Sequence, residues 1–324
     1  MVELNGKKIL VTFLMHLGDL TLTTPFIHAL RKAAPDAHIT MLVDEKLKDV
    51  VLFNPYLDEV VTIDKKGRDN SILSLWACSR HLSKLDFDVL INLHPNERCS
   101  FIDAMTSVKL RTGTTHKIFK WFWDVFTPLD RSMHAADMYL DVLQQLGVQD
   151  LSNNGLEIFP GEEHFLEAEL FWQEQNITDQ DKLIGFNIGS AVPTKRWPPE
   201  RFAEVADIFA AKGYKTVFFG GPMDEEMVAE ATGYMQTRPI IATGHFAIGG
   251  LAAAMRRCCL IITNDSGPMH VAISQKVPIV AMYGPSNPKL YGPYTKDAVI
   301  VTAQPPCQGL SLIHISEPTR LQLI

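Results

Sequence analysis

The sequence predicts an α/β protein with two similar domains, each built on a parallel sheet that is covered by helices. Short apolar segments of strand length alternate with longer segments of helical periodicity along most of the 324 residues. The alternation stops between residues 148 and 165 and then starts again. Strands that alternate with helices are typical of right-handed βαβ units and therefore of parallel sheets.

The first half of the chain supplies the elements of one domain. Strands are expected at 8–14, 38–43, 60–64 and 89–93, and helices at 24–32, 45–53, 70–84 and 134–146. Pro25 fits the first turn of its helix, where its missing N–H loses no hydrogen bond. Gly18 and Asp19 are expected to form the turn between the first strand and this helix.

The second half repeats the pattern without close repetition of sequence. Strands are expected at 183–188, 216–220, 239–241, 260–264, 278–284 and 298–301, and helices at 199–212, 224–235, 248–256 and 267–275. Residues 148–165 lack periodicity and are rich in Asn, Gly and Pro, so they are predicted to form a linker. We therefore expect two Rossmann-like domains, at residues 1–155 and 156–309.

Composition restricts the class of protein. Hydrophobic residues make up 46% of the chain and charged residues 21%, as in soluble globular proteins. The formal net charge of −7 argues against nucleic acid as a partner. No stretch approaches the roughly 18–20 apolar residues that span a bilayer. The apolar run at 8–15 is better explained as a core strand than as a signal peptide, so we expect a cytosolic protein.

The end of the chain differs in character from the rest of the sequence. Residues 310–320 read LSLIHISEPTR, which resembles the conceptual translation of a transposon-end adapter used in sequencing libraries. We expect residues 310–324 to be an artefactual tail and the second domain to be truncated near residue 309. The alternative is an ordinary terminal segment.

Motifs for metals and common cofactors are absent or misplaced. The sequence Asp86-Phe87-Asp88 has the DxD spacing of some metal sites, but it precedes a strand and is interpreted as a turn and strand entry. No GxGxxG follows the first strand, and neither GxSxG nor GxxxxGK[ST] occurs. The five cysteines form no CxxC pair and are expected to be reduced and mostly buried: Cys78, Cys99, Cys258, Cys259 and Cys307. No metal or cofactor is expected.

Candidate site residues were sought where strands end, because ligands of open α/β sheets bind beyond the carboxyl ends of the strands. Asp19 follows the first strand. Its carboxylate is suited to removing a proton from an acceptor hydroxyl. The alternative is that Asp19 caps the N-terminus of the next helix.

A second candidate is the turn NDSGPMH at 264–270, between a strand and a helix. Gly267 allows close approach of a ligand to the backbone, and the N–H groups of a helix start bind phosphate. In the alternative interpretation, Asp265 and Ser266 only cap this helix and His270 is a packing residue.

Two further loops lie at the same expected edge of the second sheet. The loop after strand 183–188 combines Ser190 and other small residues with Lys195, which suits a pyrophosphate, although the cation could instead be solvated. Asp224 and Glu225 follow strand 216–220, and we interpret them as helix caps.

Residues 109–131 are basic and aromatic within an acidic protein. Lys117 and Lys120 alternate here with Trp121 and other aromatic residues. This composition is suited to contact with an anionic glycolipid and a membrane surface. The alternative is an amphipathic core helix with solvated lysines.

Four segments together resemble the ADP-heptose:lipopolysaccharide heptosyltransferases of glycosyltransferase family 9. They are HLGDLTLTTPFIHALRKAAPDAHITMLV, GSAVPTKRWPPERF, FFGGPMDEE and IITNDSGPMHVAISQKVPIVAMYGPSNP. The resemblance implies a GT-B fold in which two Rossmann-like domains face a central cleft. It also implies transfer of heptose with inversion and without a metal, from ADP-heptose to a lipid A–core glycolipid of the inner core. Peripheral contact with the cytoplasmic face of the inner membrane would follow.

The resemblance also implies roles for individual residues. Asp19 matches the proposed general base, and Lys195 the cation near the donor phosphates. The residues that match the phosphate, nucleotide and sugar loops are Ser190, Asp265, Ser266, Gly267 and His270. Met223 stands where some members carry a Glu near the ribose or adenine, which puts that contact in doubt.

Two alternatives to this function stay open. One is a related GT-B enzyme that uses another nucleotide sugar, and the other is a nucleotide-binding module without catalysis. The acceptor position is also open, although the HLGD and LTTP pattern favours the branch heptosyltransferase III subgroup.

Overall fold

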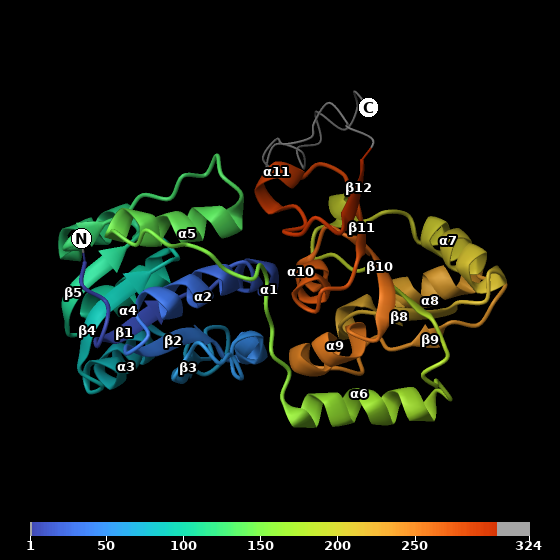
Figure 1. Ribbon diagram of the computed structural model, residues 1–324, viewed down its shortest axis with the longest axis horizontal. Coiled ribbons are helices and arrows are strands. Elements are labelled where there is room, and N and C mark those ends of the chain that lie inside the picture. The colour runs from blue at the N-terminus through green and yellow to red at the C-terminus, as the bar shows by residue number, and fades with distance from the viewer. Residues whose placement is uncertain (1, 303–324) are drawn as a thin grey trace. The chain divides into compact units, whose positions relative to one another are not determined.

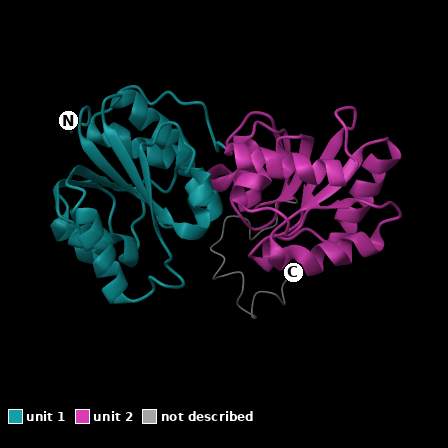
Figure 2. Cartoon of the chain, turned by 90° about the horizontal axis from the view of Figure 1, so that it is seen from below, with its two compact units in different colours: residues 1–159 teal, residues 160–324 magenta. Residues whose placement is uncertain are grey.

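The computed structural model describes residues 2–302, which form two compact units divided between Phe159 and Pro160 (Figure 2). The expected domain boundary, after residue 155, lies a few residues before this division. Cys307 and the expected tail at 310–324 lie outside the described residues. Each unit is described by itself below.

Unit 1 contains a six-stranded parallel sheet in the order β3-β2-β1-β4-β5-β6 (Figure 1). Its strands are β1 (Lys8–Thr12), β2 (His38–Asp44), β3 (Glu59–Ile63), β4 (Phe87–Asn92), β5 (Val108–Gly113) and β6 (Val125–Phe126). Its helices are α1 (Leu17–Thr21), α2 (Thr24–Ala33), α3 (Ile72–Ser83), α4 (Glu97–Met105) and α5 (Ala135–Leu146), with 3-10 turns η1 (Glu45–Val50) and η2 (Lys117–Phe122). The strand order reverses at β1, so β1 and β4 flank the switch point of this sheet.

Unit 2 repeats this plan, with strands in the order β12-β11-β10-β7-β8-β9. They are β7 (Leu183–Asn187), β8 (Lys215–Phe219), β9 (Ile240–Ile241), β10 (Cys258–Asn264), β11 (Ile279–Tyr283) and β12 (Ala298–Thr302). The helices are α6 (Glu162–Glu174), α7 (Pro199–Ala211), α8 (Glu225–Tyr234), α9 (Ile248–Met255), α10 (Gly267–Ser274) and α11 (Pro288–Tyr291), with 3-10 turns η3 (Pro193–Lys195) and η4 (Pro222–Asp224). Here β7 and β10 flank the switch point.

The central strands are apolar because helices cover both faces of each sheet. Every residue of β7 is buried, as is every residue of β1 after Lys8. Continuous apolar runs of this kind are typical of parallel strands covered on both faces. Stacked rings of Phe186 and Phe218, with centroids 5.1 Å apart, join β7 to its neighbour β8.

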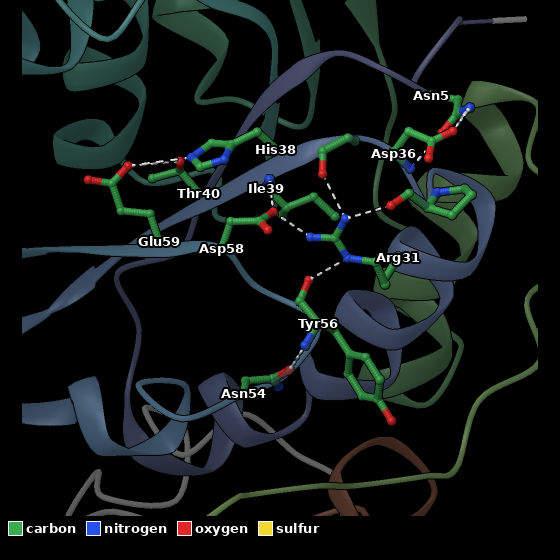
Figure 3. Close-up of polar contacts among 12 residues, drawn as sticks. Asn5, Arg31, Asp36, His38, Ile39, Thr40, Asn54, Tyr56, Asp58 and Glu59 are labelled. Atoms are coloured by element: carbon green, nitrogen blue, oxygen red, sulfur yellow. Dashed lines mark hydrogen bonds and ion pairs between the residues drawn. The ribbon is translucent and has the colours of Figure 1, made fainter.

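Arg31 ties α2 to the first strands of unit 1 (Figure 3). Its guanidinium group donates hydrogen bonds to the carbonyl oxygens of Tyr56 and Ala37, at 3.1 and 2.7 Å, and to Asp58 Oδ2 at 2.5 Å. The same Oδ2 accepts the backbone N–H of Ile39 at 2.7 Å. Burial alone would raise the pKa of Asp58, but these hydrogen bonds and the charge of Arg31 lower it below 3.8.

Several expectations about elements are wrong. Gly18 and Asp19 lie in the short helix α1 and not in a turn. The expected linker at 148–165 overlaps the start of α6, whose Phe171 and Trp172 are buried. The alternative interpretation of segment 109–131 as an amphipathic core helix is wrong, because the segment contains most of β5, all of η2 and all of β6. In β5 cations alternate with apolar residues at the period of a half-buried strand, whereas the strands predicted from the sequence were continuous, mainly apolar runs.

Within residues 2–302, no helix is both long enough and apolar enough to cross a membrane. In the same range, Cys78, Cys99, Cys258 and Cys259 are free thiols. Cys99 and Cys258 are buried, whereas Cys259 is exposed and departs from the expectation of burial.

Candidate functional site

Asp19 lies at the switch point of unit 1, just beyond the carboxyl end of β1. It is the third residue of α1, and its side chain is 21% exposed. The N-cap positions of α1 and α2 are His16 and Thr23, so the interpretation of Asp19 as a helix N-cap is wrong. His16 Nδ1 lies 3.7 Å from Asp19 Oδ2. A partly exposed carboxylate at this position is available to a ligand.

Lys65 supports the backbone that leads to Asp19. It follows β3, and its Nζ donates to the carbonyl oxygens of Leu14 and Met15, at 2.7 and 3.0 Å. The same Nζ lies 3.1 Å from Asp44 Oδ2, and both side chains are largely buried. Lys65 thus joins the ends of β1, β2 and β3. Lys65 was not predicted as a site residue, although its position directly after a predicted strand was the available signal.

Arg98 extends this network from the first turn of α4. It donates hydrogen bonds to the carbonyl oxygen of Lys65 and, at 2.7 Å, to Asn70 Oδ1. These contacts connect the start of α4 with the loop between β3 and α3. Arg98 was not predicted as a site residue, because nothing local in the sequence indicates which loop it meets.

His94 follows β4, on the other side of the switch point from β1. It is buried, and its Nδ1 has no hydrogen-bond partner among the described residues. Burial, followed by the charges of Lys65 and His16, lowers the pKa of His94 to about 4. The imidazole is therefore neutral near pH 7. Sequence reasoning also missed this residue, which stands at a strand end like Asp19.

Lys195 and Asp265 meet at the switch point of unit 2. Lys195 ends η3 in the loop after β7, and Asp265 follows β10. Their Nζ and Oδ2 atoms lie 2.7 Å apart, and the side chains are 20% and 6% exposed. Lys195 is therefore not a solvated surface cation. The pairing brings together two loops that the sequence analysis considered separately.

The start of α10 lies beside this ion pair. Ser266 occupies the N-cap position, but its side chain makes no capping hydrogen bond. Its Oγ instead accepts a hydrogen bond from Asn187 Nδ2 at 2.9 Å. Gly267 is the first helical residue, and His270, on the next turn, is 4% exposed. Ser266 is therefore the N-cap residue by position, as the alternative interpretation expected, but its side chain does not cap the helix.

Ser190 is held in the loop after β7. It is 7% exposed, and its carbonyl oxygen accepts a hydrogen bond from Arg196 Nε at 2.8 Å. The backbone N–H of Trp197 donates to Asn264 Oδ1 at 3.0 Å, which fixes this loop against the end of β10. Ser190, Lys195, Asp265, Ser266, Gly267 and His270 are thus gathered at one edge of one sheet.

The third loop of unit 2 packs against the first. A Cβ on Gly189 would lie 2.2 Å from Asp224 Oδ1, so only glycine permits this approach. Asp224 occupies the N-cap position of α8, as expected, but its Oδ2 accepts the backbone N–H of Gly221 at 2.9 Å and so caps the preceding turn η4. Glu225 is the first residue of α8 and not its cap. Met223 is 90% exposed at the rim of this loop.

Lys117 and Lys120 lie on the exposed turn η2 of unit 1. Lys120 Nζ lies 4.4 Å from the ring centroid of Phe126. Asp19 belongs to unit 1 and the Ser190–His270 group to unit 2, so the expected cleft that unites them stays a prediction.

The DxD sequence lies at the opposite edge of the first sheet. Asp88 accepts the backbone N–H of Lys8 at 2.9 Å and lies 2.7 Å from Lys109 Nζ, which confirms its interpretation as a strand entry. Across residues 2–302, no group of three or more His, Cys, Asp or Glu side chains is arranged to hold a metal ion. Catalysis without a metal nevertheless stays a prediction.

Comparisons with known proteins agree with this geometry. The family model for glycosyltransferase family 9 (heptosyltransferase) matches residues 75–311. Lipopolysaccharide heptosyltransferase 3 of Escherichia coli strain K12 is 24% identical over 297 residues, which cover 87% of this chain and 84% of the relative.

Solved structures extend the similarity over both units. A glycosyl transferase family 9 structure from Veillonella parvula DSM 2008 is 57% identical, with a TM-score of 0.91, covering 93% of this chain and 88% of that one. The E. coli heptosyltransferase WaaC with ADP is 18% identical and has a TM-score of 0.73, covering 94% and 96% of the two chains. The two parallel sheets with their helices confirm the expected GT-B class of fold.

Proposed function

The chain belongs to glycosyltransferase family 9, and on that premise we propose that it transfers heptose from ADP-L-glycero-D-manno-heptose to the inner core of lipopolysaccharide. The observation that carries the proposal is the group of polar residues at the switch point of unit 2. A lysine, a buried serine and an uncapped helix start together provide the donors that a pyrophosphate requires.

The donor is proposed to bind to this group. Lys195 and the first N–H groups of α10 would face the phosphates, and the Ser190 hydroxyl would donate a further hydrogen bond. Asp265 would hold the Lys195 ammonium in place through the contact already described. Gly267 would allow the sugar or phosphate to approach the backbone, with His270 packed beneath the loop.

Asp19 is proposed to act as the general base. It would accept the proton of the acceptor hydroxyl as that oxygen forms a bond to the anomeric carbon. The bond between the anomeric carbon and the phosphate oxygen breaks on the opposite face, so the configuration inverts. ADP leaves with the electron pair, and Lys195 and the start of α10 would stabilise its growing negative charge. No cofactor or metal takes part in this proposal.

The acceptor is proposed to be a lipid A–core glycolipid, reached at the cytoplasmic face of the inner membrane. Lys117 and Lys120 are exposed cations on unit 1, suited to anionic groups of such a molecule. The HLGD and LTTP pattern leads us to propose the heptosyltransferase III position among the possible steps.

Transfer assays test the donor and the acceptor separately. The protein is incubated with defined truncated lipopolysaccharides and, in parallel, with ADP-heptose, UDP-sugars or GDP-sugars. The expected result is the gain of one heptose, seen by mass spectrometry, with ADP-heptose only. Transfer from a UDP- or GDP-sugar would favour the related enzyme instead. Binding of ADP without transfer or donor hydrolysis would favour the non-catalytic module.

A further inference from the structure

Tyr283 is a buried phenol at the edge of unit 2 that carries the proposed donor site. It is the last residue of β11 and is 4% exposed. Strand β11 is the neighbour of β10, and the backbone N–H of Asp265 donates to the carbonyl oxygen of Met282 at 3.2 Å. Tyr283 therefore ends its strand beside Asp265, although the proposed function gives this tyrosine no role.

The hydroxyl of Tyr283 meets two other segments of unit 2. It donates a hydrogen bond at 2.9 Å to the carbonyl oxygen of Tyr291, the last residue of α11. Its oxygen lies 3.8 Å from Sδ of Met269, which is fully buried in the first turn of α10. The phenol thus lies between α11 and the helix start that the donor phosphates are proposed to face.

The carboxylate of Asp265 is the charge that this phenol faces. Burial, followed by the charge of Asp265 and a hydrogen bond to its side chain, raises the pKa of Tyr283 above 10. The hydroxyl therefore keeps its proton near neutral pH and remains a hydrogen-bond donor. Its one proton has two acceptors within reach, the carbonyl oxygen of Tyr291 and the carboxylate of Asp265.

The loop that follows Tyr283 also packs against the loop that carries Lys195. A Cβ on Gly284 would lie 3.2 Å from the carbonyl oxygen of Thr194. Thr194 and Lys195 are consecutive residues of η3. The loops after β7, β10 and β11 therefore meet around the ion pair of Lys195 and Asp265.

A diphosphate competes with Asp265 for the ammonium group of Lys195. The two side chains are 2.7 Å apart without a ligand, and that of Asp265 is 6% exposed. When Lys195 turns toward phosphate oxygens, the buried carboxylate loses part of its compensation. This loss is costly, because water does not reach the carboxylate to replace the missing interaction.

We infer that Tyr283 is a positioning residue of the donor site, which holds the Asp265 carboxylate while Lys195 binds the diphosphate. The phenol proton turns from the carbonyl oxygen of Tyr291 to Asp265, because a hydrogen bond to a charged acceptor is stronger than one to a neutral acceptor. Tyr283 acts through Asp265 and does not touch the substrate. The inference deepens the proposed function and rests on it for the place of the diphosphate.

A double-mutant cycle on ADP binding tests the inference. Tyr283→Phe removes only the hydroxyl and should weaken ADP binding at least about tenfold in calorimetric titration, as expected for a hydrogen bond to a charged group. In the Asp265→Asn background the same substitution should change the affinity less than about twofold, because the amide carries no charge. A merely structural hydroxyl would cause the same loss in both backgrounds.

The matched control is Tyr214→Phe. Tyr214 is a half-buried tyrosine of unit 2 that precedes β8, at the amino end of the same sheet, and its ring centroid lies 5.6 Å from that of Phe209. This variant should bind ADP as the unchanged protein does. The melting temperature of every variant is measured first. If Tyr283→Phe does not fold, 3-fluorotyrosine at the same position, a stronger donor, should tighten ADP binding.

Three results would overturn the inference: normal ADP affinity in folded Tyr283→Phe, an equal loss in the two backgrounds, or unchanged affinity with the fluorinated residue. Each leaves the proposed function standing. Absence of ADP binding in the unchanged protein would contradict the proposed donor and the inference together. Failure of heptose transfer with the expected cycle intact would count against the proposed function alone.

Discussion

Lys195 Nζ and Asp265 Oδ2 lie 2.7 Å apart, which joins the loop after β7 to the loop after β10. The side chain of Asp265 is almost fully buried, so the pair is shielded from water and holds the lysine in one place. A diphosphate binds well to a fixed ammonium group that lies beside the N-terminus of a helix.

Removal of either partner should weaken binding of ADP. We expect Lys195→Met to lower the affinity about 10- to 100-fold, the range for loss of a hydrogen bond to a charged group. Asp265→Asn should produce a smaller loss, because the lysine remains but is no longer held. Calorimetric titration with ADP measures both. Lys212→Met, an exposed lysine after α7, is the control and should bind normally. Normal affinity in Lys195→Met would show that the phosphates bind elsewhere.

Asp19→Ala should abolish transfer while ADP binding persists. Loss of a general base lowers the rate by about 10²- to 10⁴-fold. Donor binding should be unchanged, because the proposed nucleotide residues belong to unit 2. Transfer rate and ADP affinity are measured on the same preparation, with Asp36→Ala, an exposed acid before β2, as the control. Full transfer by the Asp19 variant would refute its role as base.

Asp103 should make stability fall as pH rises. It is fully buried on α4, where burial raises its pKa to about 8, and it accepts a hydrogen bond from Thr12 Oγ1 at 2.8 Å. Between pH 4 and about 8 the folded chain keeps this proton while the unfolded chain has lost it. The free energy of unfolding therefore falls with pH in this window, by about 1.4 kcal/mol per pH unit from this group.

Asp103→Asn removes this dependence, because the amide does not ionise and its oxygen still accepts from Thr12. The melting temperature is expected to fall less steeply between pH 5 and pH 8 for the variant than for the unchanged protein. If the melting temperatures of the two proteins fell in parallel with pH, Asp103 would be ionised in the folded state.

Arg31→Met should destabilise unit 1 by about 2 kcal/mol, since it leaves the carbonyl oxygens of Tyr56 and Ala37 without their donor. Denaturant unfolding measures the change. Lys32→Met, which removes an exposed ion pair with Asp150, is the control, with an expected change below about 0.5 kcal/mol. An equal effect of the two substitutions would contradict the role given to Arg31.

The pH dependence of the Arg31 effect has a definite sign. Asp58 has a lowered pKa in the folded chain, so its contact with Arg31 contributes stability above pH 3.8, and this is lost as the pH falls further. The difference between Arg31→Met and the unchanged protein should therefore shrink in acid.

The alternation of strands and helices could be read from the sequence because periodicity is local. Strand β1 and helix α2 were predicted near their observed bounds, and the residues that follow strands were found as site candidates. Helix α6 and strand β5 were missed. In α6 the buried aromatic residues adjoin a segment rich in turn formers. In β5 polar and apolar residues alternate, and the expectation of continuous apolar strands did not include that pattern.

By itself the sequence determined the fold class, the family and the identity of Asp19 and the unit 2 loops as candidates. Only the tertiary structure decided which strands are neighbours, such as β1 and β4 or β7 and β10. It also decided that Lys195 pairs with Asp265 and that His94 is buried. The physical reason is that strand order follows from the packing of apolar surfaces far apart in the chain. A side chain after one strand therefore carries no local record of the strand beside it.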